Sequence, residues 1–317
     1  MHVKKTWLFL FLKIFIAAAA LFFLFSKIRI DDIRGAFENP QNPWWILAAL
    51  LLLLPNLLLQ WIRWHFLLRE IQPDVRFSES ASSLFGGMVV GLITPGRIGE
   101  LGRSLFLKRI DRLHALGMVF LDKLYAFFVI LVSGLWGLVF MLLHTFDSTR
   151  FIVWPLMAAA ILLTVVVISV ACHPQWIRGL LYHISLIFPI RDNLKRFIHF
   201  MDGFTPRRAR QFLSLTMGYY SVYLVQFCFF AWAFAKAPLP HVLSATSATL
   251  FAKSLLPISL GDLGIREGAA VYFFLKFQVS KVAAFNSSIL LFATNVLIPS
   301  VLGLLFLHRI GWKDGNH

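Results

Sequence analysis

The chain has 317 residues, of which 59% are hydrophobic and only 14% charged, and its formal net charge is +15 at pH 7. A soluble domain does not need so much apolar surface, so the composition predicts a polytopic membrane protein. The basic residues are spread between apolar runs instead of forming one patch, which argues against nucleic-acid binding and favours a positive-inside topology.

Six apolar runs reach the length of about 20 residues that a helix needs to cross the hydrocarbon core of a bilayer. In chain order they are residues 6–26, 44–61, 117–143, 151–171, 212–235 and 283–307. We interpret each run as a membrane-spanning helix. The whole chain, residues 1–317, is then expected to form a single all-α integral membrane domain.

Two further apolar runs, residues 80–93 and 244–258, are too short to cross, since such a helix extends only about 21 to 23 Å. Each is followed by a second short segment, residues 98–109 and 265–277 respectively. A short helix, a break and a second short helix are typical of a re-entrant hairpin, which enters and leaves the membrane on the same side. The sequence therefore predicts two re-entrant helical hairpins.

The breaks in the two hairpins resemble each other. The first, within residues 94–103, reads Pro95-x-x-x-Gly99-Glu100-Leu101-Gly102, and the second, within residues 256–267, reads Pro257-x-x-x-Gly261-Asp262-Leu263-Gly264. Interrupted apolar segments at matching places in two halves of a chain are typical of transporters with inverted-topology repeats, which bind substrate near the midplane. We therefore expect both breaks to contribute to one site.

The distribution of lysine and arginine predicts the orientation. The densest basic cluster, between residues 178 and 210, lies on the cytoplasmic side if both termini are cytoplasmic. With this topology the first hairpin enters from the cytoplasm and the second from outside. Residues 176–200 have the pattern of an interfacial amphipathic helix. We expect the chain to be a multi-pass protein of the plasma membrane.

The motifs themselves resemble a known family. Pro-Gly-Arg-x-Gly-Glu at residues 95–100, Phe-Leu-Asp-Lys at 120–123 and the run at 256–268 are similar to the transmembrane region of lysylphosphatidylglycerol synthases, also called flippase-like. The resemblance covers nearly the whole chain and implies movement of lipids between leaflets. Because the sequence ends at His317, shortly after the last apolar run, we expect a stand-alone member without the aminoacyl-transferase domain.

Charged residues at the two breaks are the candidate site. An ionisable side chain at the centre of a membrane helix costs about 2.5 to 3.5 kcal/mol, so several of them together must pair or line a hydrated cavity. Arginine side chains and helix N-termini with exposed N–H groups both bind phosphate. The predicted substrate-binding residues are Arg97, Glu100, Arg103, Asp122, Lys253, Asp262, Arg266 and Glu267. The predicted hinge residues are Pro95, Gly96, Gly99, Gly102, Pro257, Gly261 and Gly264.

Simpler roles stay open for several of these residues. Asp122 and Lys253 are also compatible with an interfacial position, and Glu100 and Glu267 with a structural role as counter-charges. Pro95 and Pro257, each taken alone, are also compatible with a role as ordinary helix breakers. These alternatives concern single residues and leave the repeated pattern unexplained.

No metal-ligand pattern, nucleophile elbow or nucleotide-binding loop occurs in the sequence, so no cofactor is expected and catalysis has little support. The main hypothesis is a flippase-like protein that binds an anionic, phosphate-bearing lipid or lipid-linked precursor and moves it between leaflets. The alternatives are an intramembrane transferase and a non-transporting accessory protein of phospholipid, glycolipid or polyprenyl-lipid synthesis. Lipid-synthesis enzymes and a second copy of the chain are candidate partners.

Overall fold

The computed structural model describes residues 40–92, 94, 97–107, 110–145, 150–187, 203–256 and 264–306. These residues are almost entirely helical, and no strand occurs among them. Five helical segments in these ranges are long and apolar enough to cross a membrane. The prediction of an all-α polytopic membrane protein is therefore confirmed. The first predicted span, residues 6–26, lies outside the described residues.

The five long segments correspond to the other predicted spans. The first combines α3 (Pro43–Leu51) with α4 (Leu53–Ile71), and the last combines α13 (Lys281–Phe292), the π-helical η4 (Ala293–Leu297) and α14 (Ile298–Leu304). Between them lie α6 (Arg112–Thr145), α7 (Arg150–Cys172) and α10 (Pro206–Phe234). The short α8 (Pro174–Ile187) follows α7, where the amphipathic segment is predicted.

The helix that contains the second predicted span extends beyond it. The apolar run ends at residue 61, whereas α4 continues to Ile71. The indole N–H of Trp61 donates to Ser80 Oγ at 2.9 Å and ties α4 to α5 (Phe77–Leu92). The polar residues after Trp61 continue the helix because packing partners inside the protein satisfy them.

The segments of the first predicted hairpin correspond to α5 and the 3₁₀-helix η1 (Ile98–Phe106), which pack against each other. Small residues on α5 allow this close approach: a Cβ added to Gly87 would lie 2.3 Å from Arg103 Cγ, and one added to Gly91 would lie 2.8 Å from Glu100 Cγ. Ser83 Oγ also donates to the backbone oxygen of Arg103 at 2.8 Å. These contacts hold η1 and its charged side chains against α5.

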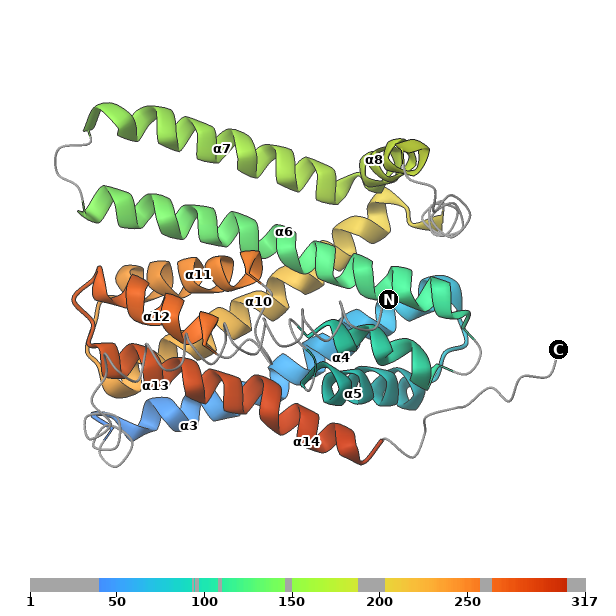
Figure 1. Cartoon of the computed structure of the whole chain (residues 1–317), viewed down its shortest axis with the longest axis horizontal. Helices are drawn as coiled ribbons and strands as arrows, with labels where there is room; N and C mark the ends of the chain where they lie inside the picture. The colour runs from blue at the N-terminus through green and yellow to red at the C-terminus, as the bar shows by residue number, and fades with distance from the viewer. Residues whose placement is uncertain are drawn as a thin grey trace, which may run out of the picture.

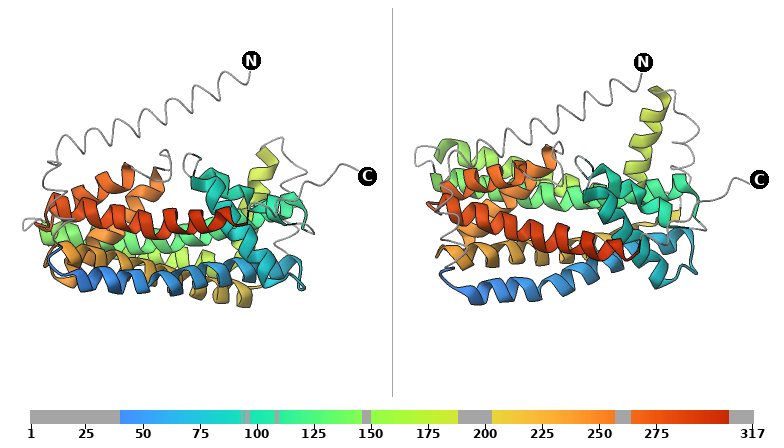
Figure 2. Two further views of the ribbon diagram at one scale, coloured as in Figure 1. Left: turned by 90° about the horizontal axis from the view of Figure 1, so that it is seen from below. Right: turned by 60° about the horizontal axis from the view of Figure 1, so that its bottom comes forward.

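The second predicted hairpin contains α11 (Leu239–Leu255) and α12 (Ile265–Leu275), which pack against each other. Figure 1 shows this pair and the α5–η1 pair at opposite ends of the bundle, both beside the long helix α6. The two views in Figure 2 show the same separation along the long axis. The arrangement fits two hairpins of opposite direction, and their re-entry from opposite membrane sides forms part of the proposal below.

The buried apolar side chains of the described residues form two separate clusters. One surrounds Phe227 and Phe274, where α10 meets α12, and the other surrounds Trp64, Tyr125 and Phe212, where α4, α6 and α10 meet. Buried charged side chains of α4, η1 and α6 belong to neither cluster. Arg63 and Arg103 nevertheless pack against aromatic members of the second cluster, Phe212 and Trp64, and these charged side chains belong to the candidate site.

Candidate functional site

A cavity of about 430 Å³ lies among α4, η1, α6, α10, α11 and η4. Tyr220, one of the residues that line it, is the middle residue of α10, so about 21 Å of helix extends from it in each direction. The cavity therefore lies at mid-length of one of the helices that are long and apolar enough to cross a membrane. Charged residues in the membrane-embedded part of such a helix need either partners or a ligand.

Asp122 of α6 joins three elements on one wall of the cavity. Its Oδ1 accepts from Arg63 Nη2 of α4 at 2.7 Å, and its Oδ2 accepts from Arg103 Nη1 of η1 at 3.1 Å. Arg63 also donates from Nε to Thr216 Oγ1 of α10 at 3.1 Å. The guanidinium carbon of Arg103 lies 4.9 Å from the centre of the Trp64 ring. Charge-assisted hydrogen bonds and cation–π contacts therefore hold both guanidiniums in place.

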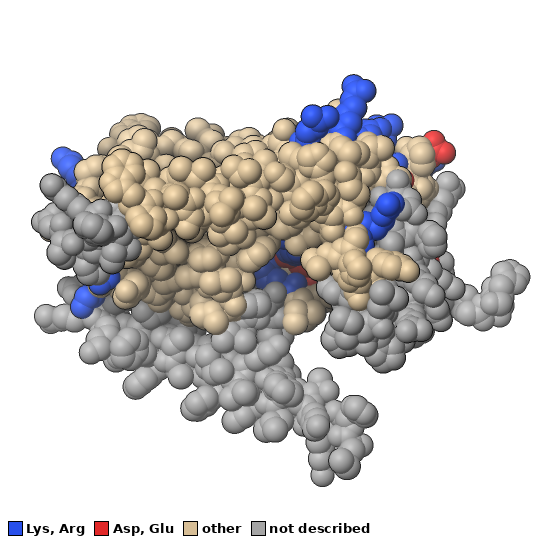
Figure 3. Space-filling model, turned by 90° about the horizontal axis from the view of Figure 1, so that it is seen from above, with Lys and Arg blue, Asp and Glu red and all other residues tan. Residues whose placement is uncertain are grey.

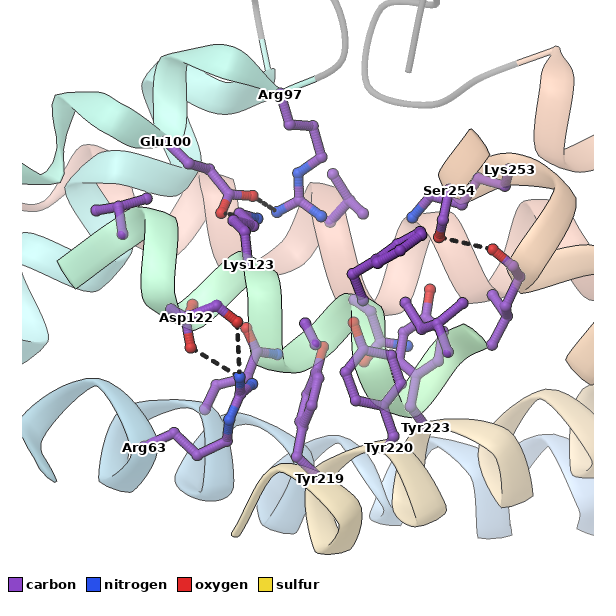
Figure 4. A pocket seen from close by; sticks show the side chains of 18 of the residues that line it. Arg63, Arg97, Glu100, Asp122, Lys123, Tyr219, Tyr220, Tyr223, Lys253 and Ser254 are labelled. Atoms are coloured by element: carbon purple, nitrogen blue, oxygen red, sulfur yellow. Dashed lines mark hydrogen bonds and ion pairs between the residues drawn. The ribbon is translucent and has the colours of Figure 1, made fainter. Parts of the chain in front are cut away.

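Glu100 of η1 forms a second centre on the same wall. Its Oε1 lies 2.6 Å from Arg97 Nη2, and its Oε2 lies 2.9 Å from Arg103 Nη2 and also pairs with Lys123 Nζ. In Figure 4 the side chains of Arg97, Glu100 and Lys123 converge beside the pair formed by Arg63 and Asp122. Since Arg103 contacts both carboxylates, the two centres form one continuous network.

The backbone that presents this network is strained at one residue and tightly packed at another. Arg97, the N-cap residue that precedes η1, has φ 55°, a left-handed conformation that is uncommon for a residue with a side chain and is often found at functional sites. Gly99 donates its N–H to Thr94 Oγ1 at 2.7 Å, and a Cβ added to it would lie 2.2 Å from Val90 O. Only glycine fits at residue 99.

The opposite wall comes from the second hairpin and from α10. Lys253 and Ser254 of α11 line the cavity across from the network, and Tyr219, Tyr220 and Tyr223 project from α10 (Figure 4). Asn295 of the π-helical η4 also lines the cavity on this side. Its side chain donates to Gln226 Oε1 at 2.7 Å. Asn295 thereby ties the last span to α10.

The described residues that line the cavity carry more positive than negative charge. Two of the lining residues are acidic, Glu100 and Asp122, and five are basic: Arg63, Arg97, Arg103, Lys123 and Lys253. Figure 3 shows blue and red atoms at the bottom of a hollow in a face that is otherwise uncharged over most of its length. A mostly apolar face with a charged hollow can accept a polar group while the apolar part of the same molecule stays in the lipid.

The structure brings some of the predicted site residues together. Arg97, Glu100, Arg103, Asp122 and Lys253 all line the cavity, although they belong to three separate segments of the chain. Of the predicted hinge residues, Gly99 and Gly102 lie in η1, and Gly264 precedes α12 with φ 89°. Five predicted residues lie outside the described ranges: Pro95, Gly96, Pro257, Gly261 and Asp262.

Arg266 and Glu267 do not line the cavity. Both side chains are fully buried at the start of α12, where Arg266 Nη2 lies 2.5 Å from Glu267 Oε1 and Arg266 Nε donates to Ser288 Oγ of α13 at 2.9 Å. Glu267 Oε2 accepts the N–H of Gly264 at 2.7 Å. This carboxylate of the same helix caps the N–H of Gly264, so that this N–H already has a partner.

Several residues of the cavity were not among the predicted site residues. Arg63 reads in the sequence as a flanking basic residue after an apolar run, and Lys123 belongs to the Phe-Leu-Asp-Lys motif at 120–123 but was not among the predicted binding residues. The tyrosines follow an i, i+4 spacing in the middle of a span, which places Tyr219 and Tyr223 on one helix face. That spacing is the only local signal that could have indicated them.

The charged groups around the cavity are suited to binding an anion. No group of three or more His, Cys, Asp and Glu side chains that could hold a metal ion occurs among the described residues. Both carboxylates of the network already accept from two or three cations, so neither is placed as a general base. Guanidinium and ammonium groups around a cavity are, in contrast, the groups that bind phosphate.

Comparisons with known proteins agree with the architecture. The chain is 26% identical over 324 aligned positions to a UPF0104 membrane protein of Methanothermobacter thermautotrophicus, and the alignment covers 92% of this chain and 90% of that protein. No solved structure matches the chain. Residues 10–303 match the family described as the lysylphosphatidylglycerol synthase TM region. The match spans both helix pairs and every described span, and the chain belongs to this family.

Proposed function

We propose that this protein binds the anionic head group of a membrane lipid in the central cavity and helps that head group to cross between leaflets. The observation that carries the proposal is the excess of basic over acidic side chains around a cavity among helices that are long and apolar enough to cross a membrane. An excess of positive charge is costly inside a bilayer. A phosphate that enters the cavity would compensate it and would replace part of its own lost hydration.

The carboxylates explain how the cavity tolerates its arginines. Glu100 and Asp122 neutralise part of the charge and hold the guanidiniums in fixed positions. A phosphate can then accept from guanidinium N–H groups that the carboxylates leave unused, because each guanidinium has five donors in a planar fork. The network is thus preorganised for an anion, and a ligand does not have to order these side chains.

The two helix pairs supply a route for transport. We propose that the α5–η1 pair enters from the cytoplasm and the α11–α12 pair from outside, as inverted repeats do in transporters. Each pair contributes one wall of the cavity, through Arg97 and Lys253 respectively. Small movements of one pair against the other would expose the cavity to one leaflet and then to the other. The apolar part of the lipid would remain in the bilayer throughout.

Reconstituted transport tests this proposal. Proteoliposomes that contain a fluorescent anionic phospholipid would be quenched from outside, and the loss of protected fluorescence gives the translocation rate. Removal of one charge-assisted hydrogen bond costs about 1.5 to 3 kcal/mol, so Lys123→Gln should weaken head-group binding roughly ten- to hundredfold. Arg208→Gln is the matched control, since Arg208 lies on α10 but is half exposed and does not line the cavity.

The alternatives make different predictions. A wild-type rate equal to that of protein-free liposomes would contradict the transport function. Formation of a modified lipid without movement between leaflets would support the transferase instead. Equal rates for Lys123→Gln and Arg208→Gln would show that the cavity does not bind the transported head group.

A further inference from the structure

A second cavity of about 210 Å³ lies on the flank of the bundle, between α6, α7 and α10. Its lining is apolar apart from Ser133, Ser221 and the Tyr220 hydroxyl, with Val132 of α6, Val167 of α7 and Leu224 of α10 among the apolar residues. It is therefore a groove without charged side chains, next to a cavity that is rich in them.

Two hydrogen bonds hold α7 at the position that forms this groove. The hydroxyl of Tyr125 on α6 donates to Ala171 O at 2.7 Å, and Nε1 of Trp136 donates to Thr164 Oγ1 at 3.1 Å. The lining residues of α6 lie between these two attachment points in the sequence. These two hydrogen bonds fix α7 to α6 on both sides of the groove. The groove is therefore held open by the packing of the fold itself.

Tyr220 connects the groove to the central cavity, because its side chain lines both. Its ring centre lies 4.8 Å from that of Tyr219 and 6.2 Å from that of Tyr223, the two other tyrosines of the central cavity. Figure 4 shows the three tyrosines side by side on α10, with Tyr219 beside Arg63. A tyrosine has an apolar ring and a polar tip, so it suits the boundary between a polar and an apolar site.

We propose that the groove holds one hydrocarbon chain of the lipid whose head group occupies the central cavity, with Tyr220 at the junction of head group and chain. This inference rests on the proposed function, since it assigns a second part of the same ligand. The occupant has to be amphiphilic because the two cavities that share Tyr220 differ in polarity. One part of such a molecule is anionic and the other is an acyl or polyprenyl chain.

The lipid that surrounds the groove determines which chains can occupy it selectively. A hydrocarbon chain gains little by moving from lipid into an apolar groove, because lipid tails are about as apolar as leucine side chains. Burial alone therefore does not select one chain over another. Selective occupancy has to come from the head group, which is held in the charged cavity. A bound ligand thus differs from surrounding lipid in that its chain occupies the groove only when its head group is anionic.

Photolabelling in nanodiscs of phosphatidylcholine tests this dependence. Two probes carry the same diazirine-bearing chain, one with a phosphatidylglycerol head group and the other as diacylglycerol without phosphate. Labelled peptides are mapped by mass spectrometry. We expect the anionic probe to label residues 128–133 and 213–224 several-fold more than the neutral probe does. Soluble glycerol phosphate should reduce that excess by competing for the central cavity.

Two variants locate the effect. Ser133→Phe fills the groove and should abolish the excess labelling, whereas Ala159→Phe, on the exposed side of α7, should retain it. Labelling that is equal for the two probes and insensitive to glycerol phosphate would overturn the inference, because it would mark ordinary surrounding lipid. The labelling result and the transport result can be told apart. Head-group-dependent labelling without translocation would support the chain-binding groove and contradict the transport function. Translocation without such labelling would support the transport function and contradict the groove as a binding site.

Discussion

Asp122→Asn is the most informative perturbation of the network, because Asp122 pairs with both Arg63 and Arg103. The substitution keeps the shape of the side chain but removes the negative charge from contacts of 2.7 and 3.1 Å. Each hydrogen bond to a charged group is worth about 1.5 to 3 kcal/mol, and breaking a buried ion pair typically costs about 3 to 5 kcal/mol. We expect a loss of stability of about 3 to 5 kcal/mol.

Thermal unfolding in detergent measures this loss. At about 2 to 4 °C per kcal/mol, Tm should fall by roughly 6 to 20 °C. The substitution also leaves the cavity with one more uncompensated positive charge. An anionic detergent-solubilised lipid should therefore raise the Tm of Asp122→Asn more than that of the wild type, because ligand binding stabilises the folded state that binds it.

Asp111→Asn is the control for this measurement. Asp111 lies just before α6, its side chain is 56% exposed, and it pairs with His114 at 3.4 Å. An exposed pair of this kind contributes little, so we expect a change within about 0.5 kcal/mol. If Asp122→Asn were as stable as Asp111→Asn, the network would not join α4, η1 and α6 energetically. If added anionic lipid stabilised both variants equally, the cavity would not be the anion site.

Three further predictions concern the hairpins and the topology. Gly99→Ala should lower stability by about 1 to 3 kcal/mol and impair transport, whereas Gly102→Ala should be neutral. Of these two glycines, Gly99 is the one where an added Cβ would meet backbone, and equal unfolding midpoints would refute the close approach of η1 to α5. Arg266→Gln should lower the stability of the fold by about 3 to 5 kcal/mol, because it removes one partner of a buried ion pair. The head-group affinity of the folded protein should stay unchanged in a direct binding titration, and weaker binding would assign Arg266 to the site. Cysteines introduced for Asp74 and Lys236 should react with an impermeant maleimide from opposite sides of the membrane, and labelling from the same side would contradict the proposed topology.

Local patterns in the sequence were sufficient to predict most of the membrane-spanning helices. The length of each apolar run is a local property, and a run of about 20 apolar residues has few stable arrangements other than a membrane helix. The short apolar runs that end in proline and glycine likewise predicted two pairs of short helices, and α5 with η1 and α11 with α12 lie there. These constraints act within a single segment, so no knowledge of its neighbours is needed.

Residue types also indicated part of the site. Arg97, Glu100 and Arg103 stand in an apolar context that does not tolerate them singly, and this cost is visible before any contact is known. Asp122 and Lys253 were indicated by the same reasoning. The sequence could not show that these five residues line one cavity, because the segments that carry them meet only in the folded bundle.

Tertiary structure alone decided which charges are partners. Arg63 is a flanking basic residue in the sequence, yet it is buried against an aspartate that lies 59 residues later in the chain. Arg266 belongs to the repeated motif, yet the adjacent Glu267 and Ser288 of α13 take up its guanidinium and keep it away from the cavity. Apolar length and helix breaks depend on neighbours along the chain, whereas the pairing of buried charges depends on which helices pack together, and only the folded structure fixes that.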